Sequence, residues 1–291
     1  MKKILLLTAV IYSGNLMAQP KLVSQATINT TTTVIAPDEE DVSNIQPQGE
    51  GQGRMNFRNF ADGETKSTTY LKNDMVKTVM KSDMGRSTTI RDNAKKLTTT
   101  LMEMMGNKTG FVATDEEQAA MRKRVDSMMQ ATRTSADTTG GTTRRAARPA
   151  EVPAEIVYTD ETKKIAGLNC KKAYIVSTRF MGLKDSSVVW YTPEIKLQNI
   201  SSTGGFSAFG NFGGSSSTSA LGKLDGFVMR QESKMGRGRS MVIEVTKIDT
   251  EKEVADKEFD IPKDFEIKPM KEMQNMIQGG GGPGRTIIRM N

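Results

Sequence analysis

Short β-prone segments that mix apolar and polar residues, separated by turn residues, recur in both halves of this chain. A period of two is typical of a half-buried strand, and a short polar break between two such segments is typical of a hairpin turn. Two pairs in the first half have this form: 67–72 and 75–81 around Asn73-Asp74, and 86–91 and 97–103 around Asp92-Asn93-Ala94. The pattern predicts an antiparallel meander here, with a further strand at 109–113.

The period changes after this meander. Between Thr114 and Met129 the apolar residues fall on one helical face, and Thr114 with Glu117 matches a capping box, which predicts a helix. Pro269 is expected to open a second, shorter helix whose apolar face carries several methionines. Between the two helices we expect strands at 155–158, 171–178, 187–192, 223–232 and 240–248.

The expected strands outnumber the helices and do not alternate with them, as they would in a parallel α/β sheet. The pattern therefore predicts an α+β fold. Its curved, mainly antiparallel sheet would wrap against one or two helices, and its loops and termini would be flexible.

Composition divides the chain further. Lys2 and Lys3 precede an apolar stretch at 4–12 and a small-residue cleavage site, which predicts a signal peptide over 1–18 and a periplasmic protein. No segment has the length of a membrane-spanning helix. The remaining divisions that we expect are a flexible lead-in over 19–53, one domain over 54–278 with a disordered insertion at 131–150 and a Gly/Ser/Phe loop at 201–219, and a flexible tail over 279–291.

The amino-acid counts remove most catalytic chemistry. The chain has no histidine and one cysteine, so Ser-His-Asp and Cys-His catalysis, histidine metal sites and an intramolecular disulfide are excluded. We expect no enzyme activity, no cofactor and no metal. The formal net charge of +7 is dispersed, and the densest basic stretch, Arg144 to Arg148, lacks aromatic neighbours on which bases would stack. Nucleic-acid binding is therefore not expected.

A family resemblance rests on four segments that follow one another along the chain. They are Ile165-Ala166-Gly167-Leu168-Asn169-Cys170-Lys171-Lys172-Ala173, Val189-Trp190-Tyr191-Thr192-Pro193-Glu194-Ile195, Leu224-Asp225-Gly226-Phe227 and Phe259-Asp260-Ile261-Pro262-Lys263-Asp264-Phe265. On these segments the chain resembles an exported Bacteroidetes-type family, domain of unknown function 4412. That family is similar to the GLPGLI group and to the lipoprotein-carrier fold of the LolA/LolB type. The resemblance implies an incomplete antiparallel barrel around an apolar cavity, and it carries over no catalytic residue.

The leading hypothesis is a non-enzymatic exported protein whose half-barrel holds an apolar ligand, such as a lipid or an acyl chain. In this hypothesis Trp190 and Met229 line the cavity, while Phe206, Phe209 and Phe212 gate it. The alternative is an envelope structural or protein-interaction module whose barrel is filled by side chains and holds no ligand. An open apolar pocket of at least about 300 Å³ would distinguish the first from the second.

Cys170 and the methionines leave further interpretations open. Cys170 is a candidate reactive thiol, because Lys171 and Lys172 would favour its thiolate, but a small buried residue at a strand start is the favoured interpretation. Two methionine sets offer the thioethers that Cu(I) prefers, although core packing is favoured for both. These sets are Met102, Met104 and Met105, and Met270, Met273 and Met276.

Overall fold

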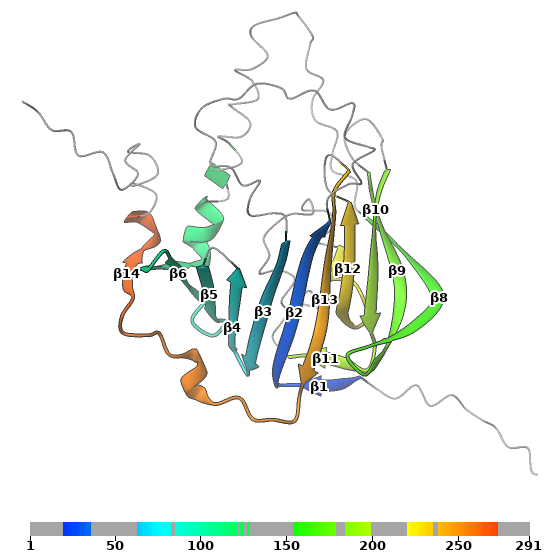
Figure 1. The fold of residues 1–291 in the computed structure, drawn as a ribbon, viewed down its shortest axis with the longest axis horizontal. Helices are drawn as coiled ribbons and strands as arrows, with labels where there is room; N and C mark the ends of the chain where they lie inside the picture. The colour runs from blue at the N-terminus through cyan, green and yellow to red at the C-terminus, as the bar shows by residue number, and fades with distance from the viewer. Residues whose placement is uncertain are drawn as a thin grey trace, which may run out of the picture.

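The structure is a computed structural model that describes residues 20–35, 63–82, 85–121, 123–124, 127, 154–178, 184–198, 220–234 and 238–272. Within these ranges a 12-stranded curved sheet has the order β14-β7-β6-β5-β4-β3-β2-β13-β12-β10-β9-β8 (Figure 1). Its neighbouring strands are antiparallel except for β14 and β7, and the sheet is not closed into a barrel. The expected fold class, α+β with a curved and mainly antiparallel open sheet, is confirmed.

The first half of the chain forms the predicted meander. Asn73, with a φ of 51°, lies in the first predicted hairpin turn, while the second turn is one residue longer than expected and spans 93–96. The strands of the meander are β3 (Gly63–Lys72), β4 (Met75–Ser82), β5 (Gly85–Asp92), β6 (Leu97–Met104) and β7 (Asn107–Thr114).

The second half forms the other side of the sheet. Its first two strands are longer than the sequence pattern indicated, because a two-residue turn at Ala166-Gly167, with φ values of 48° and 86°, joins them directly. The strands of this half are β8 (Glu155–Ile165), β9 (Leu168–Thr178), β10 (Lys184–Thr192), β12 (Phe227–Lys234) and β13 (Ser240–Asp249).

A strand that the sequence pattern did not indicate lies between the two halves (Figure 1). β2 (Gln25–Ile35) pairs with β3 on one side and with β13 on the other. Before it, β1 (Lys21–Val23) pairs in parallel with β11 (Ile195–Leu197). The expected flexible lead-in over 19–53 is therefore wrong for residues 21–35, and the domain begins well before residue 54.

The threonine run at 30–33 explains why β2 escaped prediction. Burial alternates along the strand as in any one-sided sheet, with Ala26, Ile28, Thr30 and Thr32 buried. The residue types do not alternate between apolar and polar, because threonine occupies both the buried and the more exposed face of the strand. The other expected flexible segments, at 1–18, 36–53, 131–150, 201–219 and 279–291, lie outside the described residues.

Both predicted helix starts are present. The Glu117 backbone N–H donates to Thr114 Oγ1 at 3.2 Å, and the Thr114 N–H donates to Glu117 Oε2 at 2.9 Å, so the capping box forms and residues 115–121 are helical. Pro269 ends a short strand, β14 (Glu266–Pro269), and residues 270–272 begin a helical turn directly after it.

An acidic connection ties the end of the chain to the first half of the sheet. After β13 the chain passes through the short 3-10 helix η5 (Asp256–Phe259) and reaches β14, which pairs with β7. Lys72 Nζ lies 2.8 Å from a carboxylate oxygen of Asp256, and Lys108 Nζ lies 2.6 Å from one of Asp264. These ion pairs place η5 and β14 along strands β3 to β7.

The apolar core is concentrated in the second half of the sheet. Phe227, Val228 and Met229 on β12 are at most 1% exposed, as are Val189 on β10 and Ile175 on β9. In the first half, threonines occupy several buried positions, and the hydroxyls of Thr69 and Thr78 lie 3.0 Å apart. A core poor in aromatic residues is therefore built from aliphatic side chains and buried threonines, of which Thr69 and Thr78 pair through their hydroxyls.

Candidate binding pocket

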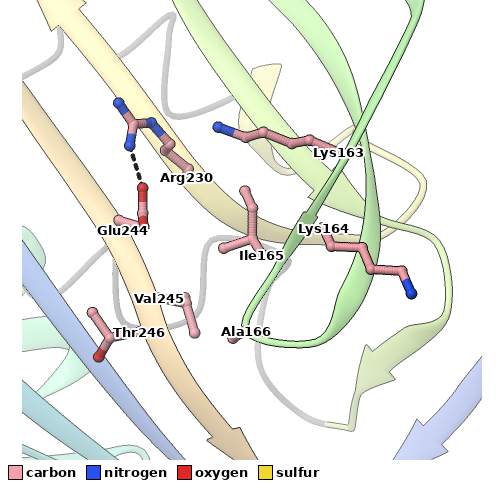
Figure 2. Close-up of a pocket in the computed structure, with 8 residues that line it drawn as sticks. All are labelled: Lys163, Lys164, Ile165, Ala166, Arg230, Glu244, Val245 and Thr246. Carbon is pink, nitrogen blue, oxygen red and sulfur yellow. Dashed lines mark hydrogen bonds and ion pairs between the residues drawn. The ribbon is translucent and has the colours of Figure 1, made fainter.

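A pocket of about 460 Å³ opens between the end of β8 and the middle of β12 and β13 (Figure 2). In the sheet, β9 and β10 separate β8 from β12. Residues of β8 and β13 face one pocket because the sheet curves back on itself at this edge. The lining residues are Lys163, Lys164, Ile165, Ala166, Arg230, Glu244, Val245 and Thr246.

The curvature also stacks a lysine on the tryptophan. Lys163 is paired with Cys170 on β9, and Trp190 on β10 is paired with Lys172. Lys163 Nζ nevertheless lies 4.3 Å from the centroid of the Trp190 ring, with Lys172 Nζ at 5.8 Å. A register shift in β8 between Tyr158 and Thr162 adds residues to this edge strand, and such bulges bend the strand that carries them.

The charged side chains of the pocket differ in whether they have a partner of opposite charge. The Arg230 guanidinium donates to Glu232 at 2.8 Å through Nε and to Glu244 through Nη1, so two carboxylates neutralise it. Lys163 has no ion pair with a carboxylate among the described residues. Burial, and next the neighbouring charge of Arg230, lower the pKa of Lys163. Of the pocket's cations, Lys163 is therefore the one that points inward without a carboxylate partner among the described residues.

Figure 2 shows how the side chains are directed. Lys163 points across the pocket toward Arg230, whereas Lys164, the next residue of the strand, points away from it. Ile165 and Val245 supply an apolar part of the lining. The pocket thus combines an ammonium group that stacks on Trp190 but has no carboxylate partner with a small apolar surface.

Trp190 and Met229, which were predicted to line a cavity, lie away from the lining of this pocket. Trp190 is 9% exposed and lies beneath Lys163, and Met229 is fully buried at the register shift between β10 and β12. Neither is among the residues that line the pocket of Figure 2. Phe206, Phe209 and Phe212 lie outside the described residues.

Sequence reasoning missed Lys163, Arg230 and Glu244. A signal was present in β12, where Arg230 and Glu232 interrupt a run of buried residues that begins at Phe227. Charged side chains in such a run need partners, and partners on another strand mark a polar site. Nothing in the sequence indicated that a lysine of β8 would reach the same place.

Cys170 is a buried structural residue. The side chain is fully buried, and its Sγ donates to the Leu168 carbonyl oxygen at 3.5 Å. Burial raises the pKa of the thiol to about 11, despite its two lysine neighbours in sequence. The favoured interpretation of this cysteine is confirmed.

The core-packing interpretation of the methionines is wrong for Met105, which is 90% exposed. The neighbouring Met104 is 40% exposed. Among the described residues, no group of three or more Cys, Asp or Glu residues is placed to hold a metal ion. Within the same ranges, no helix has the length and apolar character needed to cross a membrane.

Comparison with known proteins gives matches among solved structures alone. No family model matches the chain, and no curated protein matches it. Among solved structures, PNGF-II in a C2 crystal form has a TM-score of 0.37 and 13% identity, over 87% of this chain and 33% of that chain. A P21 form of PNGF-II has a TM-score of 0.35 and 14% identity, over 88% and 33%.

A LolA superfamily protein from Nitrosomonas europaea is also similar, with a TM-score of 0.28 and 7% identity, over 84% of this chain and 91% of that one. This chain spans about a third of the length of PNGF-II. Likenesses at these TM-scores carry no argument about function. The resemblance to the family with domain of unknown function 4412 stays a prediction.

Proposed function

We propose that the protein is a non-enzymatic exported binding protein that holds an amphiphilic ligand, an acyl chain or lipid with an anionic head group, in the pocket at Lys163. The observation that carries this proposal is the Lys163 ammonium group, which faces an open pocket without a carboxylate partner among the described residues. A buried or half-buried charge is costly unless it is paired, so an anion is the ligand that this position favours.

The pocket changes the chemistry expected of the ligand. At about 460 Å³ it exceeds the minimum of about 300 Å³ expected of a ligand site, but its lining carries Lys163, Arg230 and Glu244. A purely apolar molecule would leave the Lys163 charge without an anionic partner and would take the Arg230–Glu244 pair out of water. A carboxylate or phosphate at Lys163, with its chain against Ile165 and Val245, satisfies both parts of the lining.

A second candidate is supported by the packing around β12. Phe227, Val228 and Met229 are at most 1% exposed, so side chains fill this part of the interior. A filled interior is what an envelope interaction module requires. In that function the pocket holds no ligand, and crosslinking in cells captures a discrete partner instead.

The proposal is tested with the protein purified gently from its exported form. Native mass spectrometry should show a bound acyl anion, and a fluorescent fatty acid should bind while its methyl ester should not. Lys163→Met should weaken fatty-acid binding at least tenfold, because a charge-assisted contact contributes about 1.5–3 kcal/mol.

Lys171→Met is the matched control, since it removes the same charge from an exposed lysine of β9 that is not among the lining residues. It should leave the affinity nearly unchanged. Equal affinity of the wild type and Lys163→Met, or equal binding of acid and ester, would rule out the proposed site.

A further inference from the structure

The turn between β6 and β7 carries an exposed methionine where turn chemistry favours a polar residue. Met105 and Gly106 have φ values of 50° and 82°, the left-handed pair of a tight hairpin turn. Asparagine followed by glycine is the usual choice for such a turn, and Asn73, at φ 51°, occupies this position in the β3–β4 turn. Met105 is 90% exposed, so neither the turn nor the core explains it.

The same end of the sheet carries a row of cations. Lys66, Lys81 and Arg86 are consecutive partners across β3, β4 and β5, and neighbouring strands lie about 4.8 Å apart. Like charges directly opposite one another destabilise a sheet, so this arrangement works against the fold. The basic row, as we call these three residues, needs an explanation outside the packing of the sheet.

The basic row is accessible. Lys66 pairs with Glu64 at 3.1 Å, yet its side chain remains 75% exposed. Lys81 and Arg86 are exposed and form no ion pair with another described residue. Lys108, by contrast, is held by Asp264 at 2.6 Å and is not part of the row.

The register brings the methionine and the row together. Arg86 is the cross-strand partner of Glu103, and Met104 is the partner of Gly85. Met105 is the next residue, so it lies two residues after Glu103, the cross-strand partner of Arg86 in the basic row. An apolar tip and neighbouring cations therefore occupy one end of the sheet, on strands that do not contribute to the pocket at Lys163.

We propose that this end of the sheet is a membrane-docking surface, in which Met105 enters the acyl region of a bilayer while Lys66, Lys81 and Arg86 lie on anionic lipid head groups. Stable attachment to a membrane generally requires two signals, and an apolar anchor beside a cationic patch supplies both. A soluble polyanion would satisfy the cations, but it would give Met105 no apolar partner. The surface is independent of the pocket at Lys163.

The test is co-sedimentation of the full chain with phosphatidylcholine vesicles, with and without phosphatidylglycerol. The protein should bind the anionic vesicles, bind neutral ones far less, and be released by high salt. Met105→Asn should weaken binding to anionic vesicles at least about tenfold. The turn should keep or gain stability, because asparagine suits its backbone. Lys81→Gln with Arg86→Gln should weaken binding comparably and reduce its salt dependence.

Two control variants remove an exposed apolar side chain or two exposed lysines from other parts of the protein. Leu22→Asn changes a 65% exposed leucine in β1, and Lys223→Gln with Lys257→Gln removes two exposed lysines outside the row. Both should bind vesicles like the wild type. Melting temperature checks the fold of every variant, and Met105→Gly replaces Met105→Asn if the latter melts early. Unchanged binding by the Met105 variant, or heparin binding that competes with vesicles and ignores Met105, would overturn the proposal.

Discussion

The thiol of Cys170 is kept neutral by its surroundings, and this gives the fold a dependence on alkaline pH. Burial raises the pKa of the thiol from 9.0 to about 11. Between these values the folded chain retains a proton that the unfolded chain has lost, so the free energy of unfolding falls as pH rises. The contribution is fully present below the unperturbed pKa of 9.0 and is lost as the pH rises toward 11.

Urea unfolding across this window tests the argument. The wild type should lose more stability between neutral and strongly alkaline pH than Cys170→Ala does, since lysine and tyrosine titrations are common to both. A thiol reagent should modify the native protein slowly and the urea-unfolded protein fast. Parallel pH profiles for the two proteins, or rapid labelling of the native one, would show that Cys170 is accessible.

Single residues differ in how far the sequence could reveal their roles. The burial of Cys170 was predictable, because a small apolar residue at the start of a β-prone run is a local signal. Lys163 and Arg230 were not, because they meet only when β8 curves back past β9 and β10. Periodicity reports the face on which a residue lies, and it does not report which distant strand that face will meet.

Among the elements, the turns offer a matched pair of glycines. A Cβ on Gly226, which precedes β12 at a φ of 156°, would lie 2.3 Å from the carbonyl oxygen of Thr192. A Cβ on Gly106 would meet nothing within 4 Å, so only its φ of 82° opposes a side chain there. Backbone atoms cannot move aside as a side chain can, and the two positions therefore differ in cost.

Gly226→Ala should lower the free energy of unfolding by about 3 kcal/mol or more, from overpacking together with backbone strain. Gly106→Ala should cost about 1–2 kcal/mol, the usual penalty of a left-handed conformation. Urea unfolding of both variants measures the difference. Equal losses in the free energy of unfolding would mean that the backbone at Gly226 and Thr192 moves apart without cost.

The elements themselves were predictable where their signals are local. The hairpin at Asn73 and the capping box at Thr114 follow from neighbouring residues, and both are present. β2 was missed because its threonines conceal the alternation, although it occupies the centre of the sheet. β14 was missed because its parallel pairing with β7 depends on the acidic connection that precedes it.

For the molecule as a whole, the strand order predicts how the protein unfolds. β2 is shared by the two halves of the sheet, since it pairs with β3 and with β13 over most of its length. If either half of the sheet unfolds away from β2, the freed edge of β2 exposes a long row of unpaired backbone groups. The described sheet should therefore unfold as one cooperative unit.

The single tryptophan makes this testable, because Trp190 reports on the second half only. Leu101 lies in β6, in the first half, and is 2% exposed, so Leu101→Ala should cost about 2–5 kcal/mol. In a cooperative sheet this loss shifts the urea midpoint of Trp190 fluorescence and that of far-ultraviolet circular dichroism equally. Leu22→Ala, at a 65% exposed position, should shift neither. If the halves unfold separately, Leu101→Ala will leave the fluorescence midpoint in place, and β2 will not be the strand that unites the fold.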